Sequence, residues 1–543
     1  MIRIRKSFEY SCFWLLLIVY FLSMQLRPVF SPDEVLCAEI IREMIRSGDW
    51  FSMQLNSGII APGILPGLQL NALFAKCFSV NPFFLRLVSF GAVCCCAWLF
   101  YYFFRINKFS RLTAQFASCV FLTMPAVFFY GCSVTPDILF ALMTVLVYGV
   151  LIACQKKYIL IPPMCVYLIC GLLAGVACCL KDFSGLFIPL IAFELYLLTE
   201  KRKKDLVLFP CIMMIECLII LLLWNMLNPH VEYVHLLTDL TAEHTRFSFH
   251  LCPPIRLLKL IGGVLFWLPF FIVSCIALGK RLWQNTLWRL MIIFLVVVLL
   301  HFLFVDSSAA AILLIVFPVT VLTAAGMRNW LVLSWGKRFF RILTISVMIL
   351  DLCLVALVFA GFFTGVDSLH WFRKEEAWLW LLTIVGLSFS AVCMVFLLDE
   401  KRLWQKVRYI LFALLPFMLL FPVLYPRSLT AAIAPSSGLN KLPFIPRETM
   451  ICTVSDLLPD VCWGLKRNDI VLLDSGDPAA EWKRRLGDEK FGAVLVILKT
   501  TDFEKGRRAG IFPRDPVWQK NWIHRCIPCK IVMYQYNTRD LKR

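Results

Sequence analysis

The chain has 543 residues, of which 60% are hydrophobic and 16% are charged, and this balance excludes a protein that is soluble throughout. The formal net charge of +19 does not indicate a nucleic-acid partner, because the Lys and Arg of a membrane protein collect in its short cytoplasmic loops. Many of the 23 cysteines lie inside apolar runs, as in Cys94-Cys95-Cys96, where Cys behaves as a small hydrophobic residue. The composition predicts an all-α polytopic protein that is surrounded by membrane lipid.

The N-terminus combines basic residues up to Lys6 with an apolar run, Ser11–Leu26. Signal peptides and uncleaved first spans share this arrangement. Because Arg27-Pro28 follow and no small-x-small cleavage site is present, we interpret the run as an uncleaved first span.

Apolar runs of roughly 17–25 residues predict about 13 transmembrane helices. The predicted spans are Ser11–Leu26, Phe84–Phe104, Leu112–Tyr130, Ile138–Cys154, Tyr158–Cys179, Phe183–Leu198, Leu206–Leu227, Leu258–Leu278, Leu290–Val305, Ala309–Ala325, Ile342–Phe363, Ala377–Leu398 and Ile410–Leu424.

Alternate loops between these spans are basic. They contain Arg105, Lys108 and Arg111, then Lys156-Lys157, Lys201-Arg202-Lys203-Lys204, Lys280-Arg281, Lys337-Arg338 and Lys401-Arg402. The positive-inside rule places these loops in the cytoplasm, with the N-terminus inside and the C-terminus outside the inner (plasma) membrane. The opposite, outer loops then hold most of the polar residues that could carry chemistry.

The first outer loop, residues 27–83, is predicted to contain helices that lie on the membrane. Apolar residues from Leu36 to Ile45 recur at helical spacing, and Gly48 is a suitable stop signal. The polar residues on the other side of this helix are Glu39, Arg42, Glu43 and Arg46. A second stretch, Leu65–Val80, is placed at the interface because counting it as a span would reverse the charge bias of every later loop.

The composition becomes polar after the last span. We therefore predict a transmembrane domain over residues 1–425, a linker over 426–447, and a small extracytoplasmic α/β domain over 448–543. Within that domain, Asp469–Asp474, Phe491–Leu498 and Cys529–Tyr536 are predicted strands, and Pro478–Leu486 is a predicted helix.

The outer loops offer the groups that sugar transfer from a lipid phosphate requires: a carboxylate to accept the acceptor's proton, and cations to stabilise the departing phosphate. Asp33, in Ser31-Pro32-Asp33-Glu34, is the candidate base. The alternative is a capping box, with Ser31 as the N-cap and Glu34 as the third helical residue. The two interpretations are compatible, because a capped helix would hold Asp33 in place.

Three further outer-face positions have both a functional and an ordinary explanation. Asp137 is a second catalytic candidate or a first-turn acid favoured by the helix dipole. Lys181 is a phosphate-binding cation or a lysine extended towards the interface. In Glu243-His244-Thr245-Arg246-Phe247, Arg246 is suited to phosphate, whereas His244 alone is more typical of a surface histidine.

These residues resemble the bacterial aminoarabinose transferase and protein O-mannosyltransferase group of glycosyltransferase superfamily C. The ordered passages that carry the resemblance are Pro32-Asp33-Glu34 with Ala38-Glu39-Ile40 and Gly48-Asp49-Trp50, then Gly171-Leu172-Leu173-Ala174-Gly175 through Leu180-Lys181, Gly185-Leu186 and Pro189, then Glu243-His244 with Arg246-Phe247, and Phe266-Trp267-Leu268-Pro269. They extend over roughly Ser11–Ala325.

The resemblance implies a hexosyl or pentosyl transferase. Its donor would be a polyprenyl-phosphate sugar, and its acceptor a lipid (lipid A-like) or a protein on the periplasmic face. It gives Asp33 and Asp137 catalytic roles, and Glu34, Lys181, His244 and Arg246 roles in binding donor phosphate or substrate. His244 matches a position that holds a metal in some members. The family's Glu-Lys-Pro-Pro run is replaced by Ile60-Ala61-Pro62-Gly63, so the usual Glu partner is absent; we expect no cofactor and leave a divalent metal open.

Two other classes of protein compete with this interpretation. A transporter would use ionisable residues inside apolar runs, and Glu194, Glu216, His301 and Asp351 lie in such runs. The second alternative is a catalytically inactive family member that acts as a scaffold. It is considered because this chain has Asp306-Ser307-Ser308 where the family often has a Lys.

Overall fold

The apolar runs fold as helices, because a helix satisfies its own backbone N–H and C=O groups where water is absent. The computed structural model describes residues 2–27, 29, 33–51, 54–56, 59–60, 66–155, 162–227, 254–304, 309–332, 334–363, 377–399, 403–428, 439, 445, 449–454, 457–473, 493–508, 516–524 and 527–535. Contacts within the chain divide it into two compact units. The membrane unit comprises Met1–Met24, Gly63–Phe74 and Arg86–Phe421, and the sheet unit comprises Gln25–Pro62, Ala75–Leu85 and Pro422–Arg543.

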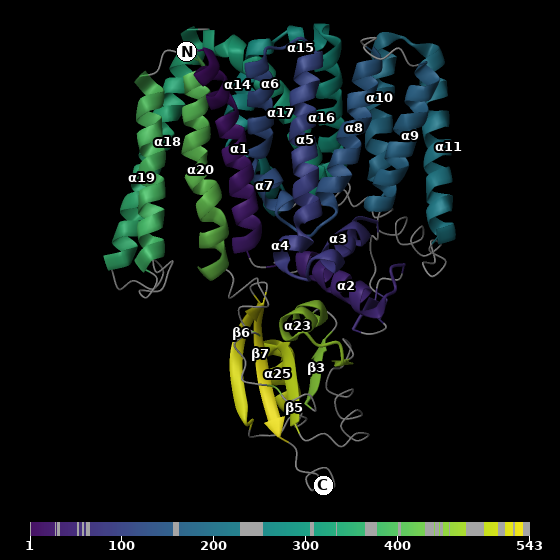
Figure 1. Ribbon diagram of the computed structural model, residues 1–543, viewed down its shortest axis with the longest axis vertical. Coiled ribbons are helices and arrows are strands. Elements are labelled where there is room, and N and C mark those ends of the chain that lie inside the picture. The colour runs from purple at the N-terminus through teal and green to yellow at the C-terminus, as the bar shows by residue number, and fades with distance from the viewer. Residues whose placement is uncertain are drawn as a thin grey trace. The chain divides into compact units, whose positions relative to one another are not determined.

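Helices form the membrane unit, and the long ones among them run side by side (Figure 1). Their bounds are α1 (Ile2–Leu26), α3 (Pro66–Cys77), α5 (Leu87–Ile106), α6 (Arg111–Leu122), α7 (Pro125–Gly131), α8 (Asp137–Gln155), α9 (Pro163–Leu180), α10 (Ser184–Glu200), α11 (Lys203–Leu227), α13 (Pro254–Val264), α14 (Leu268–Leu278), α15 (Arg281–Gln284), α16 (Thr286–Phe304), α17 (Ala309–Val332), α18 (Ser334–Phe363), α19 (Ala377–Asp399) and α20 (Leu403–Ser428). Each predicted span overlaps one of these helices or one bent pair of them.

Among the described residues, seven helices are long and apolar enough to cross a membrane, and nine spans result when each bent pair counts as one. Cys12–Leu26, Asp137–Ala153 and Arg408–Leu419 are shorter apolar helices. The chain is thus a polytopic helical membrane protein, as predicted. A total of about 13 crossings stays a prediction.

The spans predicted over Leu112–Tyr130 and Leu258–Leu278 are not straight helices. The first bends by 65° between α6 and α7, and the second by 79° between α13 and α14. Proline follows each break, because its ring lacks an N–H and clashes with the preceding helical turn. The two breaks contact each other, since the indole nitrogen Nε1 of Trp267 donates to the hydroxyl Oγ1 of Thr123 at 3.0 Å. Each bend therefore supplies a polar partner for the other.

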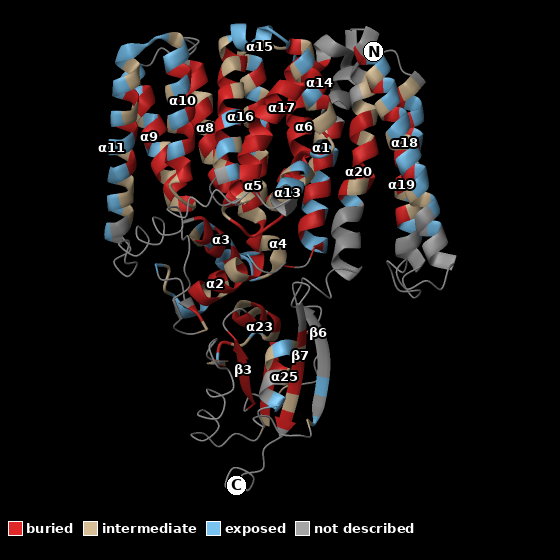
Figure 2. Cartoon of the chain, turned by 180° about the vertical axis from the view of Figure 1, so that it is seen from behind, coloured by how far each residue is buried: buried red, intermediate tan, exposed pale blue. Residues whose placement is uncertain are grey.

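Helix α17 lies at the centre of the membrane unit. Every residue from Ala310 to Met327 is buried, and α6, α8, α14, α16 and α18 pack around this helix. By contrast, only 17% of the apolar window is buried in α11 and in α18, and exposed residues recur along both helices (Figure 2). Exposed apolar helix faces of this length are typical of surfaces that contact lipid.

The sheet unit contains one five-stranded mixed sheet. Its elements are α2 (Asp33–Ser47), β1 (Gln54–Leu55), β2 (Ile59–Ile60), α4 (Pro82–Leu85), β3 (Met450–Val454), α23 (Leu458–Leu465), β4 (Ile470–Leu473), β5 (Ala493–Lys499), α25 (Thr500–Arg508), β6 (Trp518–His524) and β7 (Ile527–Gln535). The strand order is β4-β3-β5-β7-β6, in which β3 pairs parallel with β4 and β5, and β7 pairs antiparallel with β5 and β6. The small α/β domain is thereby confirmed.

The three predicted strands correspond to β4, β5 and β7, whereas β3 and β6 were not predicted. The predicted helix Pro478–Leu486 lies outside the described residues. Helix α2 confirms the helix predicted in the first outer loop, and it ends where Gly48 adopts a left-handed φ of +76°. Most residues other than Gly are strained at this φ, so Gly48 makes the stop possible. The boundaries at 425, 447 and 448 stay predictions.

Candidate functional site

Lys181 and Asp137 form an ion pair in the membrane unit. Helix α8 begins at Asp137, and α9 ends at Leu180 with Lys181 as its C-cap. Lys181 Nζ contacts Asp137 Oδ1, with 14% and 9% of the two side chains exposed. The structure thus joins two of the predicted site residues through a mostly buried pair, which a lysine extended into solvent would not form.

The backbone around Lys181 is fixed on both sides. Its amide nitrogen donates to the carbonyl of Ala177 at 3.2 Å and so closes the last turn of α9. One residue later, Asp182 Oδ1 accepts from the backbone nitrogen of Ser184 at 2.9 Å and from the Ser184 hydroxyl, at the start of α10. Asp182 therefore binds the first residue of α10, while the Lys181 ammonium pairs with Asp137.

Helix α3 packs directly against the residues that precede this pair. A Cβ atom added to Gly67 would lie 2.8 Å from Pro136 Cβ and 3.4 Å from Leu180 Cδ2. Pro136 comes before Asp137 and Leu180 comes before Lys181. Only glycine allows α3 to approach this closely, so Gly67 sets the packing beside the ion pair.

We expect Gly67→Ala to lower product formation by about tenfold, because the added methyl group must displace rigid Pro136 and with it Asp137. Gly91→Ala is the matched control, since an added Cβ there meets no atom within 4 Å. The initial rates of both variants, at equal amounts of folded protein, check this prediction. Equal rates would show that the site tolerates movement of α3.

Among the buried acceptor atoms of the membrane unit that have no hydrogen-bond partner in the described residues, two lie close to the ion pair along the chain or beside Gly67. They are the hydroxyl oxygen of Thr135, two residues before Asp137, and the amide oxygen of Asn71, one helical turn after Gly67. An unpaired buried polar atom costs roughly 1–3 kcal/mol, so such atoms are normally satisfied by water or by a bound molecule. Asn71 was not predicted as a site residue from the sequence. Asn71 lies four residues after Gly67 and therefore on the same face of the helix, and this spacing is the sequence signal that could have identified it.

Asp33 and Glu34 lie in the sheet unit, in the first turn of α2. The Asp33 side chain is exposed. Glu34 is buried, and its Oε2 contacts Arg27 Nη2 at 3.1 Å, with 4% and 2% of the two side chains exposed. The sequence analysis did not predict Arg27 as the partner of Glu34. Because Ser31 and Pro32 lie outside the described residues, the capping box stays a prediction.

His244 and Arg246 lie outside the described residues, so their roles stay predictions. Within the described ranges, no group of three or more His, Cys, Asp and Glu side chains is suited to hold a metal ion. The expectation of no cofactor stays a prediction.

The chain is similar to known proteins in both sequence and fold. The dolichyl-phosphate-mannose-protein mannosyltransferase family matches residues 68–227, which include Asp137 and Lys181. An undecaprenyl phosphate-alpha-4-amino-4-deoxy-L-arabinose arabinosyl transferase of Aeromonas hydrophila is 24% identical over 483 residues, covering 84% of this chain and 85% of the relative. The enzyme of the same name from Yersinia enterocolitica is 23% identical over 477 residues, covering 84% and 83%.

The fold is also similar to that of a solved protein. The crystal structure of ArnT from Cupriavidus metallidurans bound to undecaprenyl phosphate superposes with a TM-score of 0.71 at 16% identity, covering 97% of this chain and 98% of that chain. The apo structure of the same protein gives a TM-score of 0.72. The similarity therefore extends over both compact units.

Together, the helical fold and these relatives define a polytopic membrane glycosyltransferase. The chain is similar to the ArnT-like group of glycosyltransferases over most of its length.

Proposed function

We propose that this enzyme transfers a sugar from a polyprenyl-phosphate donor to a lipid A-like acceptor on the periplasmic face of the bacterial inner membrane. The mostly buried Lys181–Asp137 pair is the observation that carries the proposal. It is supported by relatives named for an undecaprenyl-phosphate-linked sugar and by a structural neighbour that binds undecaprenyl phosphate. In this orientation the N-terminus is cytoplasmic and the C-terminus periplasmic, as the basic loops indicate.

The chemistry requires one bond to break and one to form. The bond between the sugar's anomeric carbon and the phosphate oxygen breaks, and the acceptor oxygen forms a new bond to that carbon. The Lys181 ammonium stabilises the negative charge of the departing phosphate. Asp137 orients this ammonium through the ion pair. Asp33 accepts the proton of the acceptor hydroxyl, so charge and atoms balance.

A protein acceptor is the second candidate, because the matching family is described as a protein mannosyltransferase family. The transport alternative has less support. The buried carboxyl group of Asp351 in α18 accepts through Oδ2 from the Ser390 hydroxyl of α19 at 2.7 Å. This contact joins two helices that pack together as neighbours along the chain, which is sufficient to explain a polar pair within them.

The test is a mass-spectrometric profile of glycolipids and glycoproteins from cells that lack the gene, compared with the same cells carrying the full chain. We expect one sugar to appear on a lipid A-like species, and the same membranes should lose the corresponding polyprenyl-phosphate sugar. A sugar that appears on a protein would favour the second candidate. Identical profiles, with another phenotype of the deletion restored by the full chain, would contradict a transferase role.

A further inference from the structure

We infer that Asn468 of the C-terminal domain is a positioning residue that holds α2, the helix whose first residue is Asp33. The inference rests on the proposed function, in which Asp33 is the base. It concerns only the sheet unit, which contains both α2 and Asn468.

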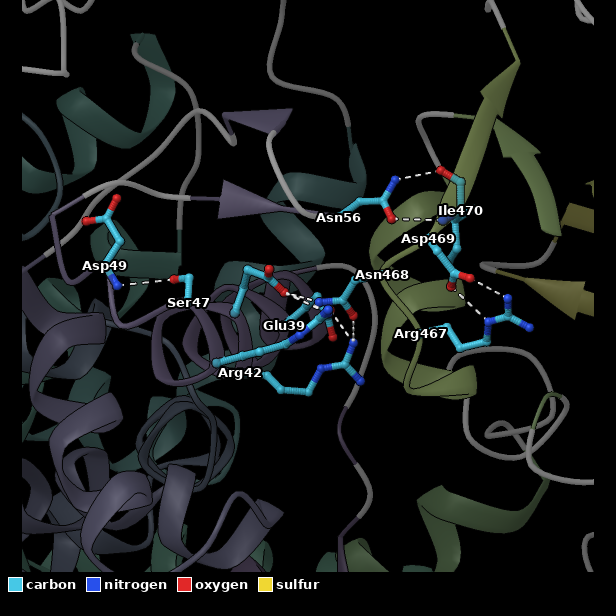
Figure 3. A network of polar contacts seen from close by, with 11 residues as sticks. Glu39, Arg42, Ser47, Asp49, Asn56, Arg467, Asn468, Asp469 and Ile470 are labelled. Atoms are coloured by element: carbon cyan, nitrogen blue, oxygen red, sulfur yellow. Dashed lines mark hydrogen bonds and ion pairs between the residues drawn. The ribbon is translucent and has the colours of Figure 1, made fainter. Parts of the chain in front are cut away.

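The amide group of Asn468 joins two oppositely charged residues of α2. Its Nδ2 donates to Glu43 Oε2, and its Oδ1 accepts from Arg42 Nη2 at 2.5 Å. Arg42 Nη2 also donates to Glu39 Oε1 at 2.6 Å (Figure 3). An amide side chain is suited to this place because it carries one donor and one acceptor group, whereas Asp or Ala would leave one charged group unpaired.

These contacts are buried. The exposed fractions are 0% for Glu39, 3% for Glu43 and 7% for Asn468. In a buried network, every polar group that loses its partner costs stability, so the network specifies one arrangement of α2 against the C-terminal domain. These charges form the polar side of the predicted helix, and the structure buries that side against the C-terminal domain. That the helix lies on the membrane stays a prediction.

A second contact fixes the segment that follows α2. The side chain of Asn56 donates through Nδ2 to the Ile470 carbonyl at 2.7 Å and accepts through Oδ1 from the Ile470 backbone nitrogen at 3.0 Å. Ile470 begins β4, an edge strand, so the Asn56 amide occupies backbone groups that would otherwise lack a neighbour. Residues 468–470 therefore hold both the middle of α2 and its following loop, which fixes the helix direction.

The charges around Glu39 make this contact sensitive to pH. Burial raises the pKa of Glu39 to about 7, with Arg42 opposing and Glu43 adding to the rise. Arg46 of α2 also opposes it, and from the C-terminal domain Cys462 and Asp469 belong to the same group of charges. Glu39 Oε2 has no hydrogen-bond partner among the described residues, so a proton can be held there.

We expect the stability of the sheet unit to fall as pH rises from about 4.5 to about 7 and then to level off, because the folded state binds the Glu39 proton more tightly than the unfolded state. Glu39→Gln resembles the protonated form and should remove this decline. Unfolding of the sheet unit, followed by amide exchange across this pH range, checks the prediction. An unchanged decline in the variant would assign it to another group.

The positioning role is tested with Asn468→Ala and Asn468→Asp in the full chain, reconstituted in lipid nanodiscs. The donor is undecaprenyl phosphate-linked 4-amino-4-deoxy-L-arabinose and the acceptor is lipid A. We expect kcat to fall by about 10- to 100-fold, while the KM for the donor changes little, because the base is misplaced rather than the donor site. Amide exchange along α2 should become faster in the same variants.

A rescue separates positioning from loss of folding. Asn468→Asp adds a third carboxylate to those of Glu39 and Glu43. Adding Glu43→Gln lets the side chain at position 43 donate a hydrogen bond and the side chain at position 468 accept it, which is the reverse of the wild-type contact. The double variant should recover kcat and slow exchange. Glu504→Gln is the control, since Glu504 pairs with Lys530 in the same domain without involving α2.

Wild-type kcat in Asn468→Ala, or failure of the double variant to recover activity although α2 exchange returns to normal, would overturn the inference. A wild-type protein that forms no product would instead contradict the proposed function with these substrates. In that case α2 exchange in the Asn468 variants still decides whether Asn468 holds the helix.

Discussion

Replacing Asp33 by Asn should lower transfer by about 10²- to 10⁴-fold, because Asn cannot accept the acceptor's proton. The Asp33 side chain is exposed at the start of α2, and Asn has nearly the same shape, so we expect the fold to be retained. Initial rates with saturating donor and acceptor, together with thermal unfolding, check this expectation.

The control for this change is Asp502→Asn. Asp502 is also an acidic residue in the first turn of a helix of the sheet unit, α25. A carboxylate whose only role is its interaction with the helix dipole contributes about 0.3–1 kcal/mol to the free energy of unfolding. Both substitutions should therefore lower stability by this small amount. Wild-type transfer by Asp33→Asn would eliminate Asp33 as the base and leave only its helix-starting role.

Lys181→Met is expected to abolish transfer and to destabilise the membrane unit by about 3–5 kcal/mol, because Asp137 would remain buried without its cation. Thermal unfolding in detergent and initial transfer rates measure the two effects separately. The size of the stability loss follows from burial, since only 9% of the Asp137 side chain is exposed.

The double variant Lys181→Met with Asp137→Leu distinguishes a functional pair from a structural one. Removing both charges should restore most of the lost stability, because no buried charge is left unpaired. It should not restore transfer, since no cation remains for the departing phosphate. Recovery of both stability and transfer would mean that the pair only supports the packing of α8 and α9.

The amino-acid sequence determined the features that depend on neighbouring residues. Apolar runs located the helices, because hydrophobicity and helical period are local properties. Gly48 gave the end of α2, since a left-handed residue is a local requirement. The start of α8 at Asp137 and the strands that became β4, β5 and β7 followed from the same kind of signal.

Local signals also failed in two informative ways. Strands β3 and β6 were not predicted, because the sequence analysis found no strand pattern before Asp469 or between Leu498 and Cys529. The bends at Pro125 and Pro269 were not predicted within the spans Leu112–Tyr130 and Leu258–Leu278, since hydrophobicity persists through a bend that proline creates.

Only the tertiary structure decided which side chains meet. Lys181 is 44 residues from Asp137, and Asn468 is 425 residues from Glu43. Whether a charge such as Glu39 faces solvent or is buried depends on which distant segment packs on it, and helical period cannot supply that information. The sequence by itself thus located the helices and named Asp33, Asp137 and Lys181 as candidates. The pairing of Lys181 with Asp137, and of α2 with Asn468, was decided by packing between segments far apart in the chain.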